Sequence, residues 1–366
     1  MSSRTRAIVA TVVLCLLSCA LPCLSSEAAG QVRQGRGVQP SLLEQMRSEA
    51  RAAIAAAAAA RKPSEALDTY DRFFTSVKKH DLTLLVPAVN AVLTDIALDP
   101  ANRARILALE RLARSGDMNA RGQLESAAGG QNTLMPAGIE ADCALARLGD
   151  SPAVDRLIGR LENEMPPDKG SIITGLRDAD AKRAAYAIVP FLTDDNPSNR
   201  LAAIQALAKF GSREHIAALR AAFDAESHAY MRQSLAMALH SAGSNAGDAL
   251  LAQLETASLP DSRLLAVEAY HASNSPKWTA LARQLLRSSG EGARLRSAVL
   301  LGLSDADARR ELTTAAKSTN MATREVGAML LESAGSRDTT LLVTLLRDPS
   351  PFVRTYAAGA LLAGSR

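Results

Sequence analysis

The stretch that decides the fold is the C-terminal one, "DPSPFVRTYAAGALLAGSR", residues 348–366. It opens with a helix start signal, Asp-Pro-Ser-Pro, because Asp and Ser cap helix N-termini and proline is tolerated in the first helical turn. The residues that follow Pro351 are mostly small or apolar, which predicts one helix that continues to the end of the chain. The stretch therefore looks like the first half of a helical hairpin rather than the end of one.

The same pattern recurs along the chain at intervals of 30 to 33 residues. Its first column is basic at eight of nine positions: Arg105, Gly138, Lys169, Arg200, Arg232, Arg263, Arg294, Arg324 and Arg354. Three residues later the side chain is mostly small, and seven residues later it is leucine at all but one position, so that one helix face is apolar and allows close approach. Eleven residues later stand residues that can end a helix in the left-handed conformation: Gly116, Gly149, Asp180, Gly211, Gly243, Asn274, Asp305, Gly335 and Ser365.

A second apolar segment follows each helix end, as in "SREHIAALRAAFDAE" (212–226) and "SRDTTLLVTLLRD" (336–348). Each unit is therefore a helical hairpin, and one hairpin cannot bury its apolar face alone, so successive hairpins must stack. The composition agrees, since 47% of residues are hydrophobic but only 3% are aromatic. The sequence predicts an all-α solenoid of about eight helical hairpins plus a terminal helix over residues 99–366.

The segment "DPSPFVRTYAAGALL" resembles the first helix of a HEAT repeat through its Asp-Pro, Val-Arg and Ala-Ala-x-Ala-Leu elements. The short unit is most similar to the bacterial HEAT-like repeats of the phycocyanobilin-lyase type. This resemblance implies an α-α superhelix of the HEAT/armadillo-like kind, with an Asp and Arg ladder that bonds neighbouring units. An Asp stands six residues before the Arg in three units (Asp99/Arg105, Asp194/Arg200 and Asp348/Arg354), so we expect an incomplete ladder.

The N-terminal third is organised differently. Residues 1–28 combine Arg4 and Arg6, an apolar core and small residues, which predicts a signal peptide and export to the periplasm or cell envelope of a bacterium. Two routes are open: cleavage after Ala28, or lipidation of Cys19 in "LLSC", which would leave a lipid anchor. Residues 29–40 are predicted to be a flexible linker. Residues 41–98 predict an irregular N-terminal helical cap of three helices, whose alanine run 55–60 either packs on the first hairpin or binds a partner.

The sequence contains no phosphate-binding loop, His-Glu-x-x-His helix, Cys-x-x-Cys pair or Gly-x-Ser-x-Gly elbow. Lys and Arg total 42 against 38 acids, and this balance gives no support for a nucleic-acid partner. The HEAT-like deoxyhypusine hydroxylases use His-Glu dipeptides, which the sequence lacks. His240 and His271 share a register position in adjacent units, with Glu268 one turn before His271. These three are the metal candidates, and the alternative is that both histidines merely pack at the edge of the core.

We therefore expect an exported HEAT-repeat scaffold that binds a protein or peptide partner through its solenoid surface, with no catalysis and no cofactor. The alternatives are an enzyme-maturation or lyase-like factor, and a metal or small-ligand carrier that uses His240 and His271. The final helix lacks the second helix that covers it in other units. We expect its apolar residues to be partly uncovered and to form a docking end for a partner or a second copy, or else a minimal cap; they are Phe352, Tyr356, Leu361 and Leu362.

Overall fold

A computed structural model describes residues 41–129, 136–162, 169–211 and 213–365. The predicted signal peptide, the linker and Cys19 lie outside these ranges. Within them the secondary structure is helical and contains no strand, which confirms the predicted all-α fold. No helix in the described ranges is long and apolar enough to cross a membrane. From Leu43 onward the chain forms one compact unit, and the contacts given below lie within that unit.

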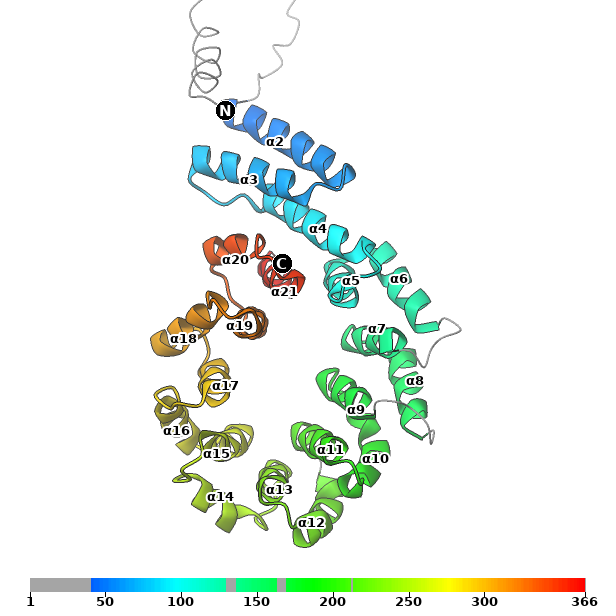
Figure 1. Cartoon of the computed structure of the whole chain (residues 1–366), viewed down its shortest axis with the longest axis vertical. Helices are drawn as coiled ribbons and strands as arrows, with labels where there is room; N and C mark the ends of the chain where they lie inside the picture. The colour runs from blue at the N-terminus through cyan, green and yellow to red at the C-terminus, as the bar shows by residue number, and fades with distance from the viewer. Residues whose placement is uncertain (1–40, 130–135, 163–168, 212, 366) are drawn as a thin grey trace, which may run out of the picture. The chain divides into compact units, whose positions relative to one another are not determined.

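Helices α2 (Leu42–Ala59), α3 (Pro63–Val77) and α4 (Leu82–Leu98) come first. Eight hairpins and one terminal helix follow, and the first helix of each hairpin lies in an inner layer while the second lies outside (Figure 1). The inner helices are α5 (Arg105–Ser115), α7 (Pro136–Arg147), α9 (Lys169–Asp178), α11 (Pro197–Phe210), α13 (Ala229–Ser241), α15 (Pro260–Ala272), α17 (Glu291–Leu301), α19 (Met321–Ser333) and α21 (Pro351–Gly364). The outer helices are α6 (Met118–Gly129), α8 (Ser151–Glu162), α10 (Ala185–Ile188), α12 (Ile216–Ala225), α14 (Asp248–Leu254), α16 (Lys277–Leu285), α18 (Ala306–Ala316) and α20 (Thr339–Leu345).

The turn between the two helices of a unit depends on the residue eleven places after the basic position. At seven of the nine positions this residue has a positive φ: Gly116, Gly149, Asp180, Gly211, Gly243, Asn274 and Gly335. Asp305 departs from the pattern, because α17 already ends at Gly302 with a φ of 76°. Asp305 instead caps the next helix by accepting hydrogen bonds from the backbone amides of Asp307 and Ala308. In this unit a glycine three residues earlier than the usual turn residue therefore ends the inner helix.

Small residues on the inner helices set the spacing of the layers. In the column three residues after the basic position, five alanines have no exposed surface: Ala108, Ala141, Ala203, Ala266 and Ala357. Gly327 holds the same position in α19, where a Cβ would collide with the backbone of Ala315 and Ala316 in α18. Helices can pack this closely only where side chains are minimal. The column therefore explains why a core with few aromatic residues is still closely packed.

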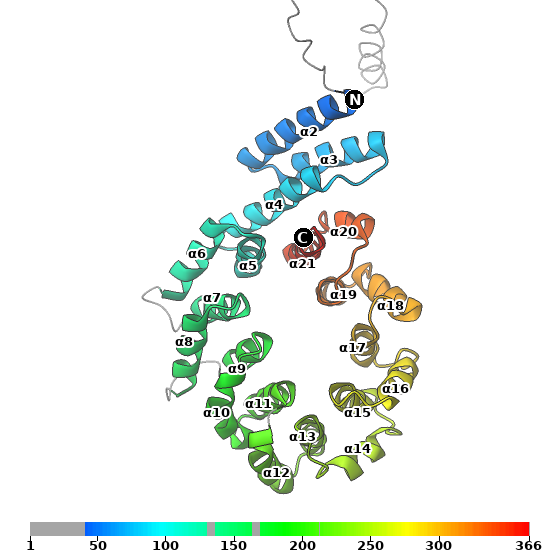
Figure 2. The same cartoon turned by 180° about the vertical axis from the view of Figure 1, so that it is seen from behind.

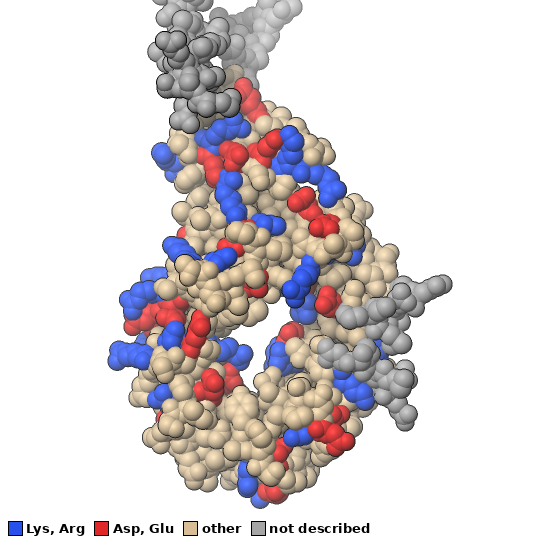
Figure 3. Space-filling model, viewed as in Figure 1, with Lys and Arg blue, Asp and Glu red and all other residues tan. Residues whose placement is uncertain are grey.

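The solenoid closes on itself (Figures 1 and 2). Each inner helix contacts the next one from α5 through to α21, and α21 in turn contacts α5 and α4. The terminal helix is thus covered by the start of the solenoid instead of by a second helix of its own. The result is a ring of inner helices around a central opening, which Figure 3 shows as a gap through the space-filling surface.

This closure corrects the expectation for the C-terminal end. Leu361 and Leu362 are only 7% and 6% exposed, because α4 and α5 cover the face that a second helix would have covered. Phe352 and Tyr356 are half-buried and pack against the same core cluster. The apolar face of α21 is therefore used inside the molecule, where it joins the two ends of the solenoid.

Candidate functional site: the inner surface of the helical ring

The inner helices run parallel to one another, with their N-termini at one rim of the opening and their C-termini at the other. First-turn residues of five inner helices gather around one cavity: Arg105, Ala137, Gly170, Ser198 and Phe352. Last-turn residues Ser115, Ser333 and Leu362 gather around another. Because helix dipoles place partial positive charge at N-termini and negative charge at C-termini, the two rims of the opening differ in electrostatic character.

The cavity at the N-terminal rim has a volume of about 840 Å³. Its apolar lining comes from Ile106 on α5, Ile139 on α7 and the aromatic side chains of Phe352 and Tyr356 on α21. A cavity of this size that combines aromatic with polar lining is typical of a ligand or peptide site. Two of the four residues predicted to form a docking end therefore line a cavity inside the ring.

Two further cavities continue along the inner surface. One of about 450 Å³ extends from α9 to α17, and one of about 540 Å³ lies where α5 meets α19 and α21. Asp178 lines all three cavities, and Arg147 lines the first and the third. The inner surface is therefore one continuous hollow rather than a set of separate pockets.

The charged groups of this hollow are mixed in sign. Arg103 and Glu140 are exposed at the N-terminal rim. In the second cavity an ion pair of 2.5 Å joins Arg296 to Glu268. Nearby, Arg177 donates a hydrogen bond of 2.7 Å to the side-chain oxygen of Gln205. Such a surface presents donors and acceptors along its length, which suits a polypeptide better than a uniformly charged polymer.

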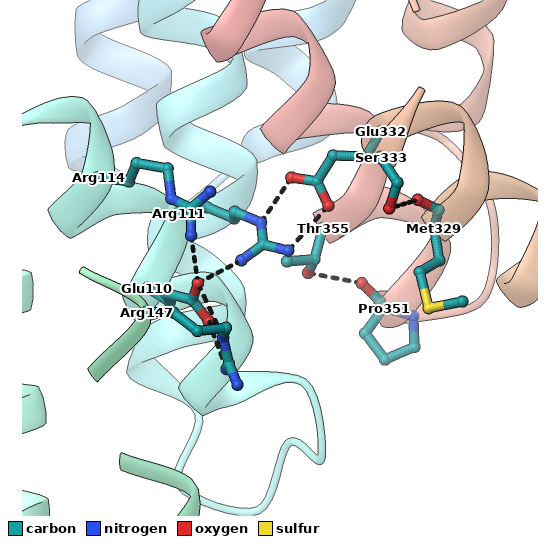
Figure 4. Close-up of polar contacts among 9 residues, drawn as sticks. All are labelled: Glu110, Arg111, Arg114, Arg147, Met329, Glu332, Ser333, Pro351 and Thr355. Carbon is teal, nitrogen blue, oxygen red and sulfur yellow. Dashed lines mark hydrogen bonds and ion pairs between the residues drawn. The ribbon is translucent and has the colours of Figure 1, made fainter. Parts of the chain in front are cut away.

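Buried charges join three inner helices where the ring closes (Figure 4). Glu332 on α19 accepts two hydrogen bonds from Arg111 on α5, at 2.6 and 2.8 Å. Arg111 also pairs with Glu110, which has no exposed surface. Glu110 in turn accepts a bond of 2.7 Å from Arg147 on α7 and another of 2.7 Å from Arg114. The chain of charges thus runs from α19 through α5 to α7.

The two carboxylates of this network differ in how they ionise. Burial opposes ionisation of Glu110, but the hydrogen bond from Arg147 and the charges of three arginines outweigh it and lower its pKa. For Glu332 burial dominates, the nearby negative charge of Glu110 adds to it, and its pKa is raised despite the bond from Arg111. Of the two carboxylates, Glu332 is therefore the one that loses its negative charge more readily.

A second set of polar contacts lies on the outer side of the closure. Arg347, just after α20, forms ion pairs with Asp68 and Asp71 of α3, at 2.9 and 2.6 Å. His80, just before α4, lies 3.4 Å from the hydroxyl of Thr340 in α20 and 2.6 Å from that of Tyr70. We call the contacts of α3, α4 and α5 with α19, α20 and α21 the seam.

The basic column of the repeat has a defined structural role. The guanidinium groups of Arg200, Arg294, Arg324 and Arg354 each donate to the backbone carbonyls six and five residues earlier, at 2.9–3.3 Å. Two of them also reach the acid that precedes the basic residue of the following unit. Arg200 pairs with Glu226 at 3.3 Å, and Arg324 pairs with Asp348 at 2.8 Å. The sequence pattern did not predict the Arg200–Glu226 pair, because that pattern required Asp and the acid here is Glu.

A sequence model of the family described as HEAT repeats matches residues 154–240. These residues span units whose hairpins recur throughout the ring. The chain contains HEAT repeats in this segment. Human deoxyhypusine hydroxylase in complex with glycerol is a similar solved structure, at 18% identity, with 70% of this chain and 98% of that chain covered and a TM-score of 0.38.

An engineered protein is also similar, at 15% identity, with 88% of this chain and 95% of that chain covered and a TM-score of 0.35. Among curated proteins, none matches the chain.

The HEAT-repeat protein does not bring its metal candidates together. The imidazole of His240 is bound to Asp248 at 2.8 Å and to Ser273 at 3.1 Å. The ring of His271 packs edge-on against Trp278, and Glu268 is paired with Arg296. Among the described residues no group of three or more His, Cys, Asp and Glu side chains could hold a metal ion. The shared register of the two histidines places them on neighbouring helices, but their side chains bind different partners.

Cys143 on α7 is buried, and burial raises the pKa of its thiol to about 12. It occupies the space opposite Gly175 of α9, where a Cβ would collide with its sulfur. The thiol is therefore a small packing group between two inner helices.

Proposed function

We propose that this HEAT-repeat protein is an exported scaffold that binds a segment of another polypeptide on the inner surface of its ring. The observation that supports this most directly is the cavity of about 840 Å³ at the N-terminal rim, where Phe352 and Tyr356 form part of a lining that also carries charged side chains. Aromatic side chains in a partly closed cavity are frequent anchors in protein–protein recognition.

The size of the opening restricts what the ring can surround. The described part of the chain has nine inner helices, α5 to α21, and helix axes lie about 8–10 Å apart, which gives a ring of about 80 Å circumference and about 13 Å radius. Subtracting half a helix diameter of about 10–12 Å leaves an opening of about 15 Å. One helix or one extended strand fits, whereas a 100-residue domain with a radius of gyration of about 13 Å does not.

We also propose that the protein acts by binding and not by catalysis. Two fully buried acids of the described residues, Glu110 and Asp142, are held by arginines: Arg147 and Arg114 bind Glu110, and Arg156 and Arg160 bind Asp142 at 2.7 and 2.8 Å. The pKa of Glu110 is lowered by these contacts, which makes it a poor general base. Asp142 has no exposed surface through which a substrate could reach it. The raised pKa keeps the Cys143 thiol protonated, which makes it a poor nucleophile.

Export is part of the same proposal and rests on the N-terminal sequence. A partner would then be another protein of the periplasm or cell envelope. The intact mass of the purified native protein tests this part, since cleavage after Ala28 and lipidation at Cys19 give different masses. A mass that corresponds to the full unprocessed chain would contradict export by either route.

Photo-crosslinking in cells tests the binding surface. A photoreactive phenylalanine analogue replaces Phe352 or Tyr356 in the cavity, and the same analogue replaces Tyr186, which is 62% exposed on the outer helix α10. We expect a specific polypeptide adduct from the two inner positions and none from the outer one. Mass spectrometry of the adduct identifies the partner segment.

A cavity-filling variant provides the second arm. Thr174→Trp places a large ring in the cavity from α9, and we expect the adduct at Phe352 to disappear while the protein remains folded. Adducts that form equally at Tyr186, or that persist in the Thr174→Trp variant, would show that the partner does not occupy the inner surface.

A further inference from the structure

We propose that the seam is a clasp that opens reversibly and admits a polypeptide segment into the ring from the side. The entry of a polypeptide through the separated seam rests on the proposed binding role. The separation of the seam itself is a property of the protein alone. Four features of the seam lead to this inference.

The first feature is connectivity. Neighbouring inner helices elsewhere in the ring are joined through the outer helix of a hairpin, so their separation requires unfolding of that hairpin. At the seam, α21 lies against α4 and α5, which precede it by more than 230 residues. No hairpin joins these helices to each other, so they can separate while every hairpin stays folded.

The second feature is the polarity of the contacts across the seam. Arg111 pairs with Glu332 on its inner side, and Arg347 pairs with Asp68 and Asp71 on its outer side. Charges that are paired in a buried site have lost hydration, and they regain it when the site opens. The polar part of the seam therefore costs less to open than the apolar face of α21, which α4 and α5 also cover.

The third feature is the position of Gly359 on α21. A Cβ at this residue would collide with the carboxylate of Glu332 and would lie 3.0 Å from Nε of Arg111. The missing side chain lets the backbone of α21 lie directly on the ion pair. The closed seam thus depends on a fit that small displacements of α21 disrupt.

The fourth feature is access from the inside. The cavity of about 540 Å³ at the C-terminal rim is lined by Arg111 and Glu332, whose side chains remain 11% and 15% exposed. A charged side chain of a bound segment can therefore compete for either partner. Binding inside the ring and opening of the seam are coupled through this pair.

A lateral entry also solves a geometric problem. The opening is too narrow for a folded domain, so an internal segment of a partner with folded domains on both sides cannot be threaded into a closed ring. A clasp admits such a segment without unfolding the domains. We therefore expect the partner segment to lie within a longer chain and not only at a free end.

Distances between spin labels test the clasp without any partner. Lys79 and Arg337 are exposed and lie near His80 and Thr340 in the sequence. Spin labels on Lys79→Cys and Arg337→Cys measure the distance across the outer side of the seam. Labels on Ala221→Cys and Ala252→Cys, exposed on the consecutive outer helices α12 and α14, serve as the control pair. The buried Cys143 does not compete for the label.

We expect the seam pair to show a second, longer distance whose population rises several-fold in high sodium chloride and in Glu332→Gln. The control pair should keep one distance. Glu311→Gln is the matched variant, because Glu311 pairs with Arg294 at 2.8 Å within one hairpin. A single, salt-independent seam distance in wild type would overturn the proposal even if Glu332→Gln failed to fold. A mobile seam without adducts at Phe352 would retain the clasp and refute the binding role.

Discussion

Gly359 shows how far the closure depends on a single residue. It lies on the face of α21 that meets Glu332 and Arg111, and it is not one of the glycines that provide a turn, since it lies inside a regular helix. Glycine in a helix interior is normally unfavourable, which indicates that space and not propensity decides this position. Around it, Glu110 and Glu332 lie close together with opposite pKa shifts, and Arg111 binds both.

Replacement of Gly359 by alanine should lower the free energy of unfolding by about 1–3 kcal/mol, because the added Cβ forces the ion pair or α21 to move. Chemical denaturation of the purified protein measures the effect. Gly364→Ala is the control in the same helix, since a Cβ there meets nothing within 4 Å. Equal stabilities of the two variants would show that α21 does not lie against the ion pair.

Glu110→Gln should destabilise the protein by about 1–3 kcal/mol at neutral pH, because it leaves the half-buried Arg147, whose side chain is 27% exposed, without its charged partner. The pKa of Glu110 is lowered in the folded state, so its stabilisation is complete above its ordinary pKa of 4.5 and is lost as the pH falls through the folded value. The difference in unfolding free energy between wild type and variant should therefore shrink below about pH 4.

Urea denaturation of both proteins between neutral and acidic pH measures that difference. A difference that stays constant or grows on acidification would contradict the assignment of the lowered pKa to Glu110.

At the scale of elements, the basic column and the terminal helix illustrate two uses of the same repeat. In three complete units the arginine donates hydrogen bonds to the turn that precedes its helix, and in two of these it also pairs with the acid of the next unit. In the last unit Arg354 keeps the bonds to its own turn, with Asp348 and Pro349 as acceptors. The apolar face of α21 is then covered by α4 and α5 instead of by a following helix.

Arg324→Met should lower the free energy of unfolding by about 2 kcal/mol or more. It removes hydrogen bonds to two backbone carbonyls, and it leaves the carboxylate of Asp348, which is only 8% exposed, without its partner. Thermal unfolding measures the loss. Arg310→Met is the matched control, since Arg310 is 76% exposed and its ion pair with Asp307 should contribute less than about 0.5 kcal/mol. Similar losses in both variants would mean that the column is a solvated face.

The sequence predicted these elements well because their signals are local. Helix faces, the left-handed turn residues and the number of hairpins follow from spacing within one unit, and Asp305 is a departure because a nearby glycine replaces it. The closure could not be predicted, since Arg111 and Glu332 are 221 residues apart and neither belongs to the repeated columns. Phe352 and Tyr356 were found through their apolar pattern, whereas the cavity that they line depends on five helices that meet only in the ring.

At the scale of the whole molecule, closure changes how stability is distributed. An open solenoid unfolds from its ends, because terminal units have one neighbour and internal units have two. In this unit α21 provides the missing neighbour of α5, and one core cluster extends from Ala50 to Leu362. The terminal helices are thereby given the protection of internal ones.

Hydrogen exchange should reveal this difference. In wild type, the backbone amides of α4 and α19 should exchange at rates within about tenfold of those in α11 and α13. The double variant Glu332→Gln, Arg347→Ala should accelerate amide exchange in α4 and α19 selectively. The pair Glu311→Gln and Arg310→Met is the control for charge removal away from the seam. Uniform acceleration along the chain would indicate general destabilisation and not an opened ring.

The closed ring also fixes the number of its units. An open solenoid can gain or lose a hairpin by duplication or deletion, since each unit needs only its neighbours. In the described part of the chain nine inner helices share one full rotation, about 40° each. Removal of one hairpin would leave α21 facing the wrong surface of α5. Insertions in this protein are tolerable within the loops of a hairpin but not as whole hairpins, so length changes in its evolution or redesign should fall between helices and leave the count of units untouched.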